Sequence, residues 1–160
     1  MRKRIYRAGM IPFFRKENGD IVMNFMVPTD TEYSGDKPQF CKGRVEDGEN
    51  HEDAAVREAH EELGLKESNV KWFYYMGQYL GYTHMYICEV ENMEDFDDPH
   101  YETDYTVWLT LPEFEEKGRE LHRPVIREAY NEYLIMSEDG MGDGLDVAVY
   151  DTDVESNSLK

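Results

Sequence analysis

Apolar residues recur along the chain in two patterns, short runs that predict strands and wider spacings that predict helices. Asn18-Gly19 separates the first two runs and is a strong turn signal, so these runs are expected to form a hairpin. Pro and Gly are concentrated in residues 28–39, which predicts a loop. The predicted strands cover residues 4–14, 21–27, 70–82, 83–90 and 105–111.

Two firm helices are predicted among these strands. The first follows the Gly-rich residues 43–48, with Asn50 as its N-cap and Gly64 just past its end. The second covers residues 124–135, where apolar side chains recur at helical spacing, and residues 112–117 predict a shorter helix. Strands that precede, separate and follow helices predict an α/β or α+β fold with a mixed sheet.

The length of 160 residues suits one domain. We expect residues 1–136 to form this domain and residues 137–160 to form an acidic C-terminal tail. Within that tail, residues 145–149 have the composition of a short edge strand.

The net charge of −18, from 35 acidic and 17 basic residues, narrows the range of partners. Nucleic acids and anionic membranes are bound mainly through Lys and Arg, so broad binding to either is not expected. No apolar run approaches the roughly 20 residues that a membrane-spanning helix needs. The basic residues 2–7 are not followed by the apolar core of a signal peptide. Two cysteines make no disulfide framework, so a reduced, cytoplasmic protein is expected.

The first predicted helix carries the side chains that point to chemistry. Glu58, Glu61 and Glu62 fall on one side of the helix at about 100° per residue, beside an apolar face. Carboxylates three and four residues apart repel one another, and a divalent cation such as Mg2+ offsets that repulsion because it prefers carboxylate oxygens. Taken alone, the same pattern also describes a solvated acidic helix face.

The wider context of these carboxylates favours the metal interpretation. Residues 43–65 read GRVEDGENHEDAAVREAHEELGL and resemble the Nudix box, G-x5-E-x7-R-E-U-x-E-E-x-G-U, at all nine specified positions. Ala59 is a small apolar residue at the first U position, where a bulkier one is usual. The resemblance implies a Nudix-type α/β/α sandwich with a mixed β-sheet. The residues around Glu102 are similar to the matching loop of dinucleoside polyphosphate hydrolases and RNA pyrophosphohydrolases.

Nudix hydrolases cleave a nucleoside diphosphate linked to another group X, with Mg2+ or Mn2+ bound by the box. By this resemblance, Glu58, Glu61 and Glu62 are expected to be catalytic and to bind the metal. Either Glu61 or Glu62 would also orient or deprotonate the attacking water. Arg57 and Glu49 are expected to pair and to hold the carboxylates in place.

Residues around the box supply further expected contacts. The resemblance assigns Gly43 to the metal site, where its backbone approaches the helix and the phosphates closely. Lys42 and Arg44 are expected to contact phosphate, although solvated side chains would explain both equally well. Glu102 lies where many members take a further catalytic Glu from a loop; the alternative is one more acid in an acidic loop. Tyr82, 17 residues past the box, is expected to bind the substrate.

The favoured function is a Mg2+-dependent pyrophosphohydrolase for a dinucleoside polyphosphate such as diadenosine tetraphosphate, with Mn2+ as an alternative ion. Hydrolysis of nucleoside triphosphates, nucleotide sugars, ADP-ribose or RNA 5′ ends remains open, as does a non-catalytic module that senses a nucleotide. Sensor modules typically have eroded boxes, whereas all three ligand Glu residues are present here. Homodimers are common among relatives, so a homodimer is an open alternative to a monomer.

Overall fold

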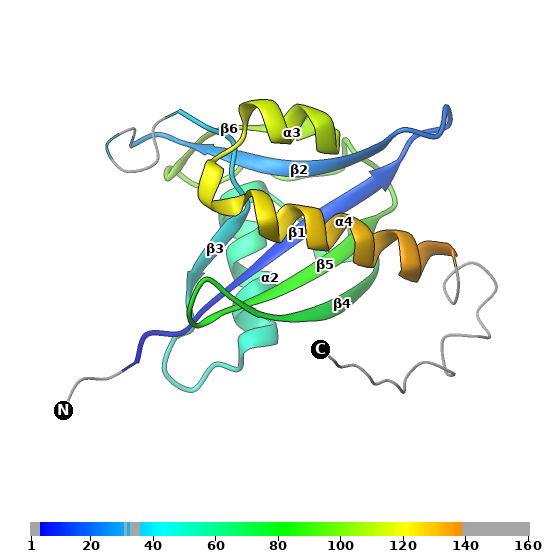
Figure 1. Ribbon diagram of the computed structural model, residues 1–160. Helices are drawn as coiled ribbons and strands as arrows, with labels where there is room; N and C mark the ends of the chain where they lie inside the picture. Colours follow the sequence, from blue (N-terminus) through cyan, green and yellow to red (C-terminus); the bar gives the residue numbers. More distant parts are fainter. Residues whose placement is uncertain (1–3, 31, 33–35, 139–160) are drawn as a thin grey trace.

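A six-stranded mixed sheet is the frame of the structure, a computed structural model that describes residues 4–30, 32 and 36–138 (Figure 1). The strands are β1 (Arg7–Arg15), β2 (Ile21–Pro28), β3 (Cys41–Arg44), β4 (Val70–Tyr79), β5 (Thr83–Val90) and β6 (Thr103–Leu109). Their order is β4-β5-β1-β2-β6, with β3 paired to β1 outside that path. β1 is parallel to β5 and antiparallel to β2 and β3, which confirms the expected mixed sheet.

One side of β1 has two neighbours along its length. Residues 7–10 pair with β3, and residues 13–15 pair with β2. β2 pairs with β1 only at residues 21–23, and farther along an isolated bridge joins its Met26 to Gln39, just before β3. We call the place where β2 and β3 succeed one another beside β1 the β2–β3 fork.

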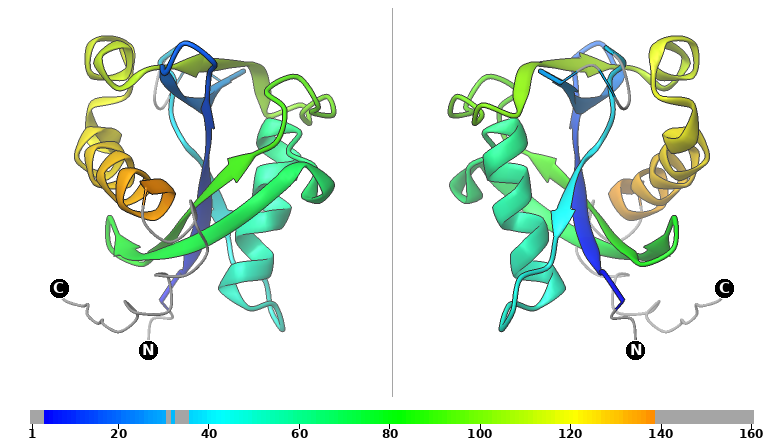
Figure 2. Two further views of the ribbon diagram at one scale, coloured as in Figure 1. Left: turned by 90° about the vertical axis from the view of Figure 1, so that its right-hand side faces the viewer. Right: turned by 90° about the vertical axis from the view of Figure 1, so that its left-hand side faces the viewer.

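Helices cover both faces of the sheet. The helices are α2 (His51–Leu63), α3 (Leu111–Lys117), α4 (Arg123–Glu138) and the short 3-10 helices η1 (Glu67–Asn69) and η2 (Glu120–His122). α2 packs on one face, and α4 packs on the other with α3 beside it (Figure 2). One apolar cluster joins Met10 and Cys41 to Ala59 of α2, and a second joins Phe13 to Tyr133 of α4. The α/β/α sandwich is confirmed.

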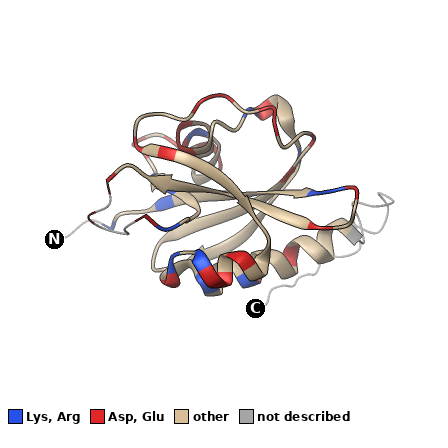
Figure 3. Cartoon of the chain, turned by 90° about the horizontal axis from the view of Figure 1, so that it is seen from above, with Lys and Arg blue, Asp and Glu red and all other residues tan. Residues whose placement is uncertain are grey.

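Charged residues are distributed according to these layers. The strands are largely free of charged positions, whereas the helices and loops carry most of them (Figure 3). Within the described part of the chain, no helix has both the length and the apolar character to cross a bilayer.

The C-terminal end of α2 is tied to the acidic loop that precedes β6. Gly64 ends the helix with a φ of 78°, and a Cβ at this position would overlap the carbonyl group of Asp97. The Thr103 hydroxyl donates to the carbonyl oxygen of Glu62 at 2.8 Å. These contacts bring the loop that contains Glu102 beside the carboxylates of α2.

Some boundaries differ from those expected from the sequence. β3 lies in a segment for which no strand is predicted, because four residues are too few to show an alternating pattern. β4 ends at Tyr79 and β6 begins at Thr103, so each is displaced by two or three residues from its expected limit. α4 continues to Glu138, so the first two residues of the expected tail are helical. The strand expected at residues 145–149 lies outside the described residues.

Candidate functional site

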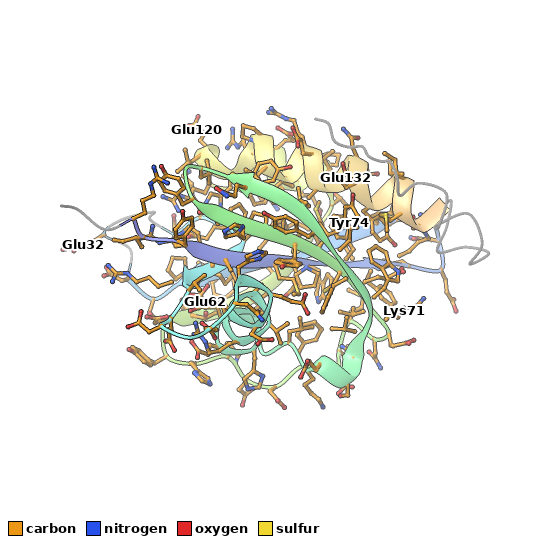
Figure 4. All side chains as sticks on the ribbon, turned by 90° about the horizontal axis from the view of Figure 1, so that it is seen from below. Glu32, Glu62, Lys71, Tyr74, Glu120 and Glu132 are labelled. Atoms are coloured by element: carbon orange, nitrogen blue, oxygen red, sulfur yellow. The ribbon has the colours of Figure 1, made fainter. Side chains whose placement is uncertain are left out.

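The last two turns of α2 carry the three box carboxylates. The Asn50 side chain caps the start of this helix by accepting from the Asp53 N–H at 2.8 Å, which fixes the helix register. Glu58 is buried, with 7% of its surface exposed, whereas Glu61 and Glu62 are half-buried. Glu62 lies on the α2 side of the sheet, away from α4 (Figure 4).

Arg57 connects the box loop with the carboxylates. Its Nε and Nη2 donate to the two carboxylate oxygens of Glu49 at 2.8 and 3.0 Å. Its Nη1 donates to Glu58 at 2.9 Å and to Glu61 at 3.3 Å, and its Nη2 also donates to the Arg44 carbonyl at 3.0 Å. The Arg57 hydrogen bond holds the pKa of the Glu49 carboxyl below its usual value. Arg57 therefore sets the position of the loop and of two carboxylates together.

β3 approaches the same carboxylates from the other side. The Lys42 backbone N–H donates to Oε1 of Glu62 at 3.1 Å. A Cβ at Gly43 would overlap the Glu58 carboxylate, so only glycine allows this strand to lie so close to α2.

Burial and mutual repulsion raise the pKa of two of these carboxyls. Burial is the main cause that raises the pKa of Glu62 to about 8, and the Glu58 carboxylate is the next. Burial also raises the pKa of Glu58, against the opposing effect of Arg57. The Glu102 carboxylate also raises the pKa of both groups. Burial and repulsion therefore oppose the ionisation of both carboxyls at once.

This donor set fits a hard divalent cation. Carboxylate oxygens are the ligands that Mg2+ and Mn2+ prefer, and a cation would offset the repulsion between Glu58 and Glu62. Among the described residues, no three His, Cys, Asp or Glu side chains already converge on one point. Arg57 lies between Glu58 and Glu61 instead, so these two carboxylates would have to turn from Arg57 to share a cation.

Of the three box carboxylates, Glu62 lines a cleft of about 380 Å³ at the β2–β3 fork. This volume lies in the range of roughly 300–1,000 Å³ that is usual for small-molecule sites. Glu62 and Glu102 line it together with Lys42. Phe40 is fully buried in its wall, whereas Tyr101 is 85% exposed at its rim. The remaining lining residues are Met26, Pro28, Thr29, Asp30 and Gln39.

A larger cavity of about 460 Å³ lies elsewhere, between α2 and the start of β4. Val56, Leu65 and Phe73 are among its lining residues, and none of the box carboxylates is. The smaller cleft, which Glu62 and Glu102 line, is therefore the candidate active site.

The structure brings most of the expected site residues together, but not all. Those that meet at or beside the cleft are Lys42, Gly43, Glu49, Arg57, Glu58, Glu61, Glu62 and Glu102. Arg44 reaches Arg57 only through its carbonyl oxygen, and its side chain is exposed. Tyr82 does not line the cleft. Its ring lies 5.2 Å from that of Tyr6, with the guanidinium of Arg4 5.1 Å from its centre.

Arg119 and His122 also lie near Lys42, and no motif or spacing in the sequence identifies either of them as a site residue. Arg119 places its Nη1 3.2 Å from Nε2 of His122 and 3.5 Å from Oε1 of Gln39. His122 is fully buried and stacks on Phe40, with ring centres 3.8 Å apart. Burial lowers the pKa of Lys42 and of His122, and Arg119 is the next cause for both. Because Arg119 is far from Lys42 in sequence, no spacing rule could have identified it.

Comparison with known proteins agrees with this fold. A family model described as the NUDIX domain matches residues 6–129. An Ap4A hydrolase from C. elegans, solved as a binary complex, is similar with a TM-score of 0.64 and 16% identity, over 81% of this chain and 98% of that chain. RenU, a Nudix hydrolase from M. smegmatis, is similar with a TM-score of 0.64 and 18% identity, over 81% and 87% of the two chains.

The pyrophosphohydrolase BsRppH from Bacillus subtilis is similar with a TM-score of 0.59 and 21% identity, over 86% of this chain and 85% of that chain. At such identities the solved structures show a shared fold, whereas the family model covers most of the chain, including the complete box. The chain therefore belongs to the Nudix family, whose hydrolases act on phosphoric anhydride bonds.

Proposed function

We propose that the protein is a Mg2+-dependent pyrophosphohydrolase whose substrate is a dinucleoside polyphosphate of the diadenosine tetraphosphate type. The observation that carries the proposal is that Glu62, Glu102 and Lys42 line one cleft beside the other box carboxylates. The shared fold with an Ap4A hydrolase supports this choice of substrate. The net charge of −18 favours a small nucleotide over a long RNA, which would need a broad basic surface.

In this proposal, Glu58, Glu61 and Glu62 hold the divalent cation that Nudix hydrolases generally use, Mg2+ or Mn2+. When bound, the metal supplies positive charge for the phosphate oxygens and makes water easier to deprotonate. Arg57 and Glu49 keep the carboxylates in place, and Gly43 leaves room for the Glu58 carboxylate beside β3.

The bond changes require a base and an anion-binding group. The oxygen of water bonds to phosphorus, the bridging P–O bond breaks, and the leaving phosphate keeps the bonding electron pair. Glu62 or Glu102 accepts the proton that the water loses, since both carboxylates line the cleft. Lys42 faces the phosphate chain from β3, and the exposed ring of Tyr101 is placed to stack on a base.

The compartment proposed for this reaction is the cytoplasm. Cys41 and Cys88 are both free and buried, which supports a reducing environment.

The direct test is hydrolysis of a nucleotide panel with Mg2+ or Mn2+, with products separated by chromatography. The panel contains diadenosine polyphosphates, ADP-ribose, FAD, nucleotide sugars, nucleoside triphosphates and a 5′-triphosphate RNA. Reaction in 18O-labelled water shows which phosphorus is attacked. Preferred turnover of a diadenosine polyphosphate is the expected result, and preferred turnover of any other class would overturn the substrate proposal.

Two variants test the assignment of the site. Glu62→Gln should lower turnover by about 100-fold or more, in line with loss of general base catalysis. Glu52→Gln changes an exposed acid in the first turn of the same helix and should leave turnover unchanged. Equal turnover by the two variants would refute the role proposed for Glu62.

A further inference from the structure

The ribbon formed by β1 and β3 carries positive charge on the face that looks away from α2. Arg7 is directly opposite Arg44, and Gly9 is directly opposite Lys42. Directly opposite residues share a face, and successive residues alternate between faces. The position of Gly43 faces Glu58 on α2, so Lys42 and its partners must face the α4 side.

Gly9 allows this face to be occupied by Lys42. A Cβ at Gly9 would overlap the Cys41 carbonyl group and would lie 3.1 Å from Cβ of Lys42. Because glycine has only a hydrogen atom at this position, the Lys42 side chain has room beside Gly9, and Lys42 is half-buried.

Arg119 reaches the same face from the segment that joins α3 to η2. Its backbone N–H donates to the carbonyl of Pro38 at 2.9 Å, and its Nη1 lies 3.5 Å from Oε1 of Gln39, so it lies beside the residues that lead into β3. Arg119 and Arg7 both act to lower the pKa of Lys42, in agreement with this placement. His122 positions Arg119, because Nε2 of its imidazole lies 3.2 Å from Nη1 of the guanidinium. The imidazole stays neutral, since burial and then Arg119 and Lys42 lower the pKa of His122 to about 2. It therefore positions Arg119 without neutralising its charge.

We call these four residues the cation face: Arg7, Lys42, Arg44 and Arg119. In the described part of the chain, none of the four forms an ion pair with a carboxylate. This is unusual in a protein with 35 acidic and 17 basic residues. Glu62 offsets part of the charge of Lys42, but no ion pair neutralises the face. The cations therefore repel one another, and a bound anion would remove that repulsion.

The cation face lies one strand away from the carboxylates of the candidate active site. The Lys42 backbone N–H donates to Glu62, whereas the Lys42 side chain belongs to the cation face. β3 pairs with β1 on one side only in the described sheet, so its other edge borders the β2–β3 fork. A chain of phosphates in the cleft can therefore pass over this edge from Glu62 to Arg119.

We propose that the cation face is a phosphate subsite, which holds a phosphate group of the substrate beyond the anhydride bond that is hydrolysed. This inference rests on the proposed function and deepens it, because it explains how the enzyme would favour a polyphosphate chain over a simple diphosphate linkage. Charge-assisted hydrogen bonds from guanidinium groups to phosphate oxygens supply the selectivity.

The first test measures binding without catalysis. Inorganic tripolyphosphate is titrated by calorimetry into the full-length protein in EDTA, so that no divalent cation takes part. Arg119→Gln and Arg7→Gln should each weaken binding by about tenfold or more, the usual effect of one charge-assisted hydrogen bond. Arg127→Gln is the matched control, because Arg127 pairs with Glu115 on the surface of α4, and its affinity should equal that of the wild type.

The second test uses inhibition of the active enzyme. Inhibition by tripolyphosphate should weaken about tenfold in Arg119→Gln, whereas inhibition by pyrophosphate, which is too short to reach both places, should be unchanged. The KM for the best substrate should rise with kcat nearly constant, since the subsite lies away from the reacting phosphorus.

The outcomes separate this inference from the proposed function. Wild-type affinity for tripolyphosphate in both variants, or no binding by the wild-type protein, would overturn the subsite. Equal weakening in Arg127→Gln would also overturn it, because the effect would then be one of overall charge. Binding that depends on Arg119 in a protein that hydrolyses no polyphosphate would keep the subsite and refute the proposed function.

Discussion

Gly43→Ala is the sharpest probe of the candidate metal site, because one methyl group acts on one carboxylate. A Cβ at Gly43 would overlap the carboxylate of Glu58. Gly43 is not among the residues with positive φ, so alanine fits the backbone and only the contact with Glu58 is disturbed. In a strand, alanine would otherwise be about 0.5–1 kcal/mol more favourable than glycine.

The structure also sets the size of the effect. Glu58 is buried and accepts from Arg57 at 2.9 Å, so it has to give up this contact when it moves. Overpacking of this kind costs about 1–3 kcal/mol. For a chain of this length, that lowers Tm by roughly 2–12 °C. Displacing one expected metal ligand should lower metal affinity and kcat by about 10–100-fold, as loss of supporting contacts commonly does.

The assays are Mn2+-dependent thermal shift, kcat at saturating Mg2+ and circular dichroism as a check on the fold. Gly48→Ala is the matched control in the same box loop, since its φ of 78° strains alanine while no atom lies within 4 Å of the added Cβ. The control should lose stability and keep its metal affinity. The same metal affinity and kcat in Gly43→Ala as in the wild type would refute the placement of Glu58 in the metal site.

Three further variants test the supports of the site. Arg57→Lys keeps the charge but loses the two-pronged contact with Glu49, so Tm and kcat should both fall, and unchanged values would contradict the supporting role. Glu49→Gln tests the pH dependence. Because Arg57 lowers the pKa of Glu49 in the folded protein, the ionised carboxylate stabilises the fold at pH values above the unfolded pKa of about 4.3. The Tm difference between the wild type and this variant should therefore be largest at neutral pH and shrink as pH falls below about 4, and a constant difference would count against the pair. Thr103→Val removes the hydroxyl that donates to the Glu62 carbonyl, so hydrogen exchange of the amides in residues 95–102 should become faster. The loss of one hydrogen bond should lower kcat by less than about tenfold. Unchanged exchange would show that this hydrogen bond does not hold the loop.

The sequence predicts best what depends on neighbours in the chain. α2 could be predicted in detail, because its cap at Asn50, its end at Gly64 and the spacing of its carboxylates are local features. β3 could not be predicted, because its four residues become a strand only by pairing with β1. The distance of Tyr82 past the box predicts a contact with the substrate. In the fold its ring lies beside that of Tyr6 and does not line the cleft, so this contact stays a prediction.

The cation face shows the same limit more clearly. Lys42 was a candidate for phosphate contact from its place beside the box, and the structure keeps it at the cleft. Arg119 and His122 come from a segment after α3, and neither belongs to a motif. Their proximity to Lys42 follows from the packing of η2 against the start of β3, which no periodicity in the sequence encodes.

The two glycines of the β1–β3 ribbon allow the two proposed sites to be separated. Gly9 and Gly43 lie on opposite faces, and a Cβ at Gly43 meets a side chain, whereas a Cβ at Gly9 meets the Cys41 carbonyl of the neighbouring strand. A backbone obstacle cannot rotate away, so Gly9→Ala should displace β3 and cost more stability than Gly43→Ala, by about 1 kcal/mol or more on the scale of overpacking penalties. Moving β3 shifts Lys42 with respect to both Glu62 and Arg119, so Gly9→Ala should weaken metal and tripolyphosphate binding together. Gly43→Ala should weaken metal binding alone. If Gly43→Ala also weakened tripolyphosphate binding in EDTA, the carboxylates and the cation face would act as one site, and the separation argued from the register of β1 and β3 would be wrong.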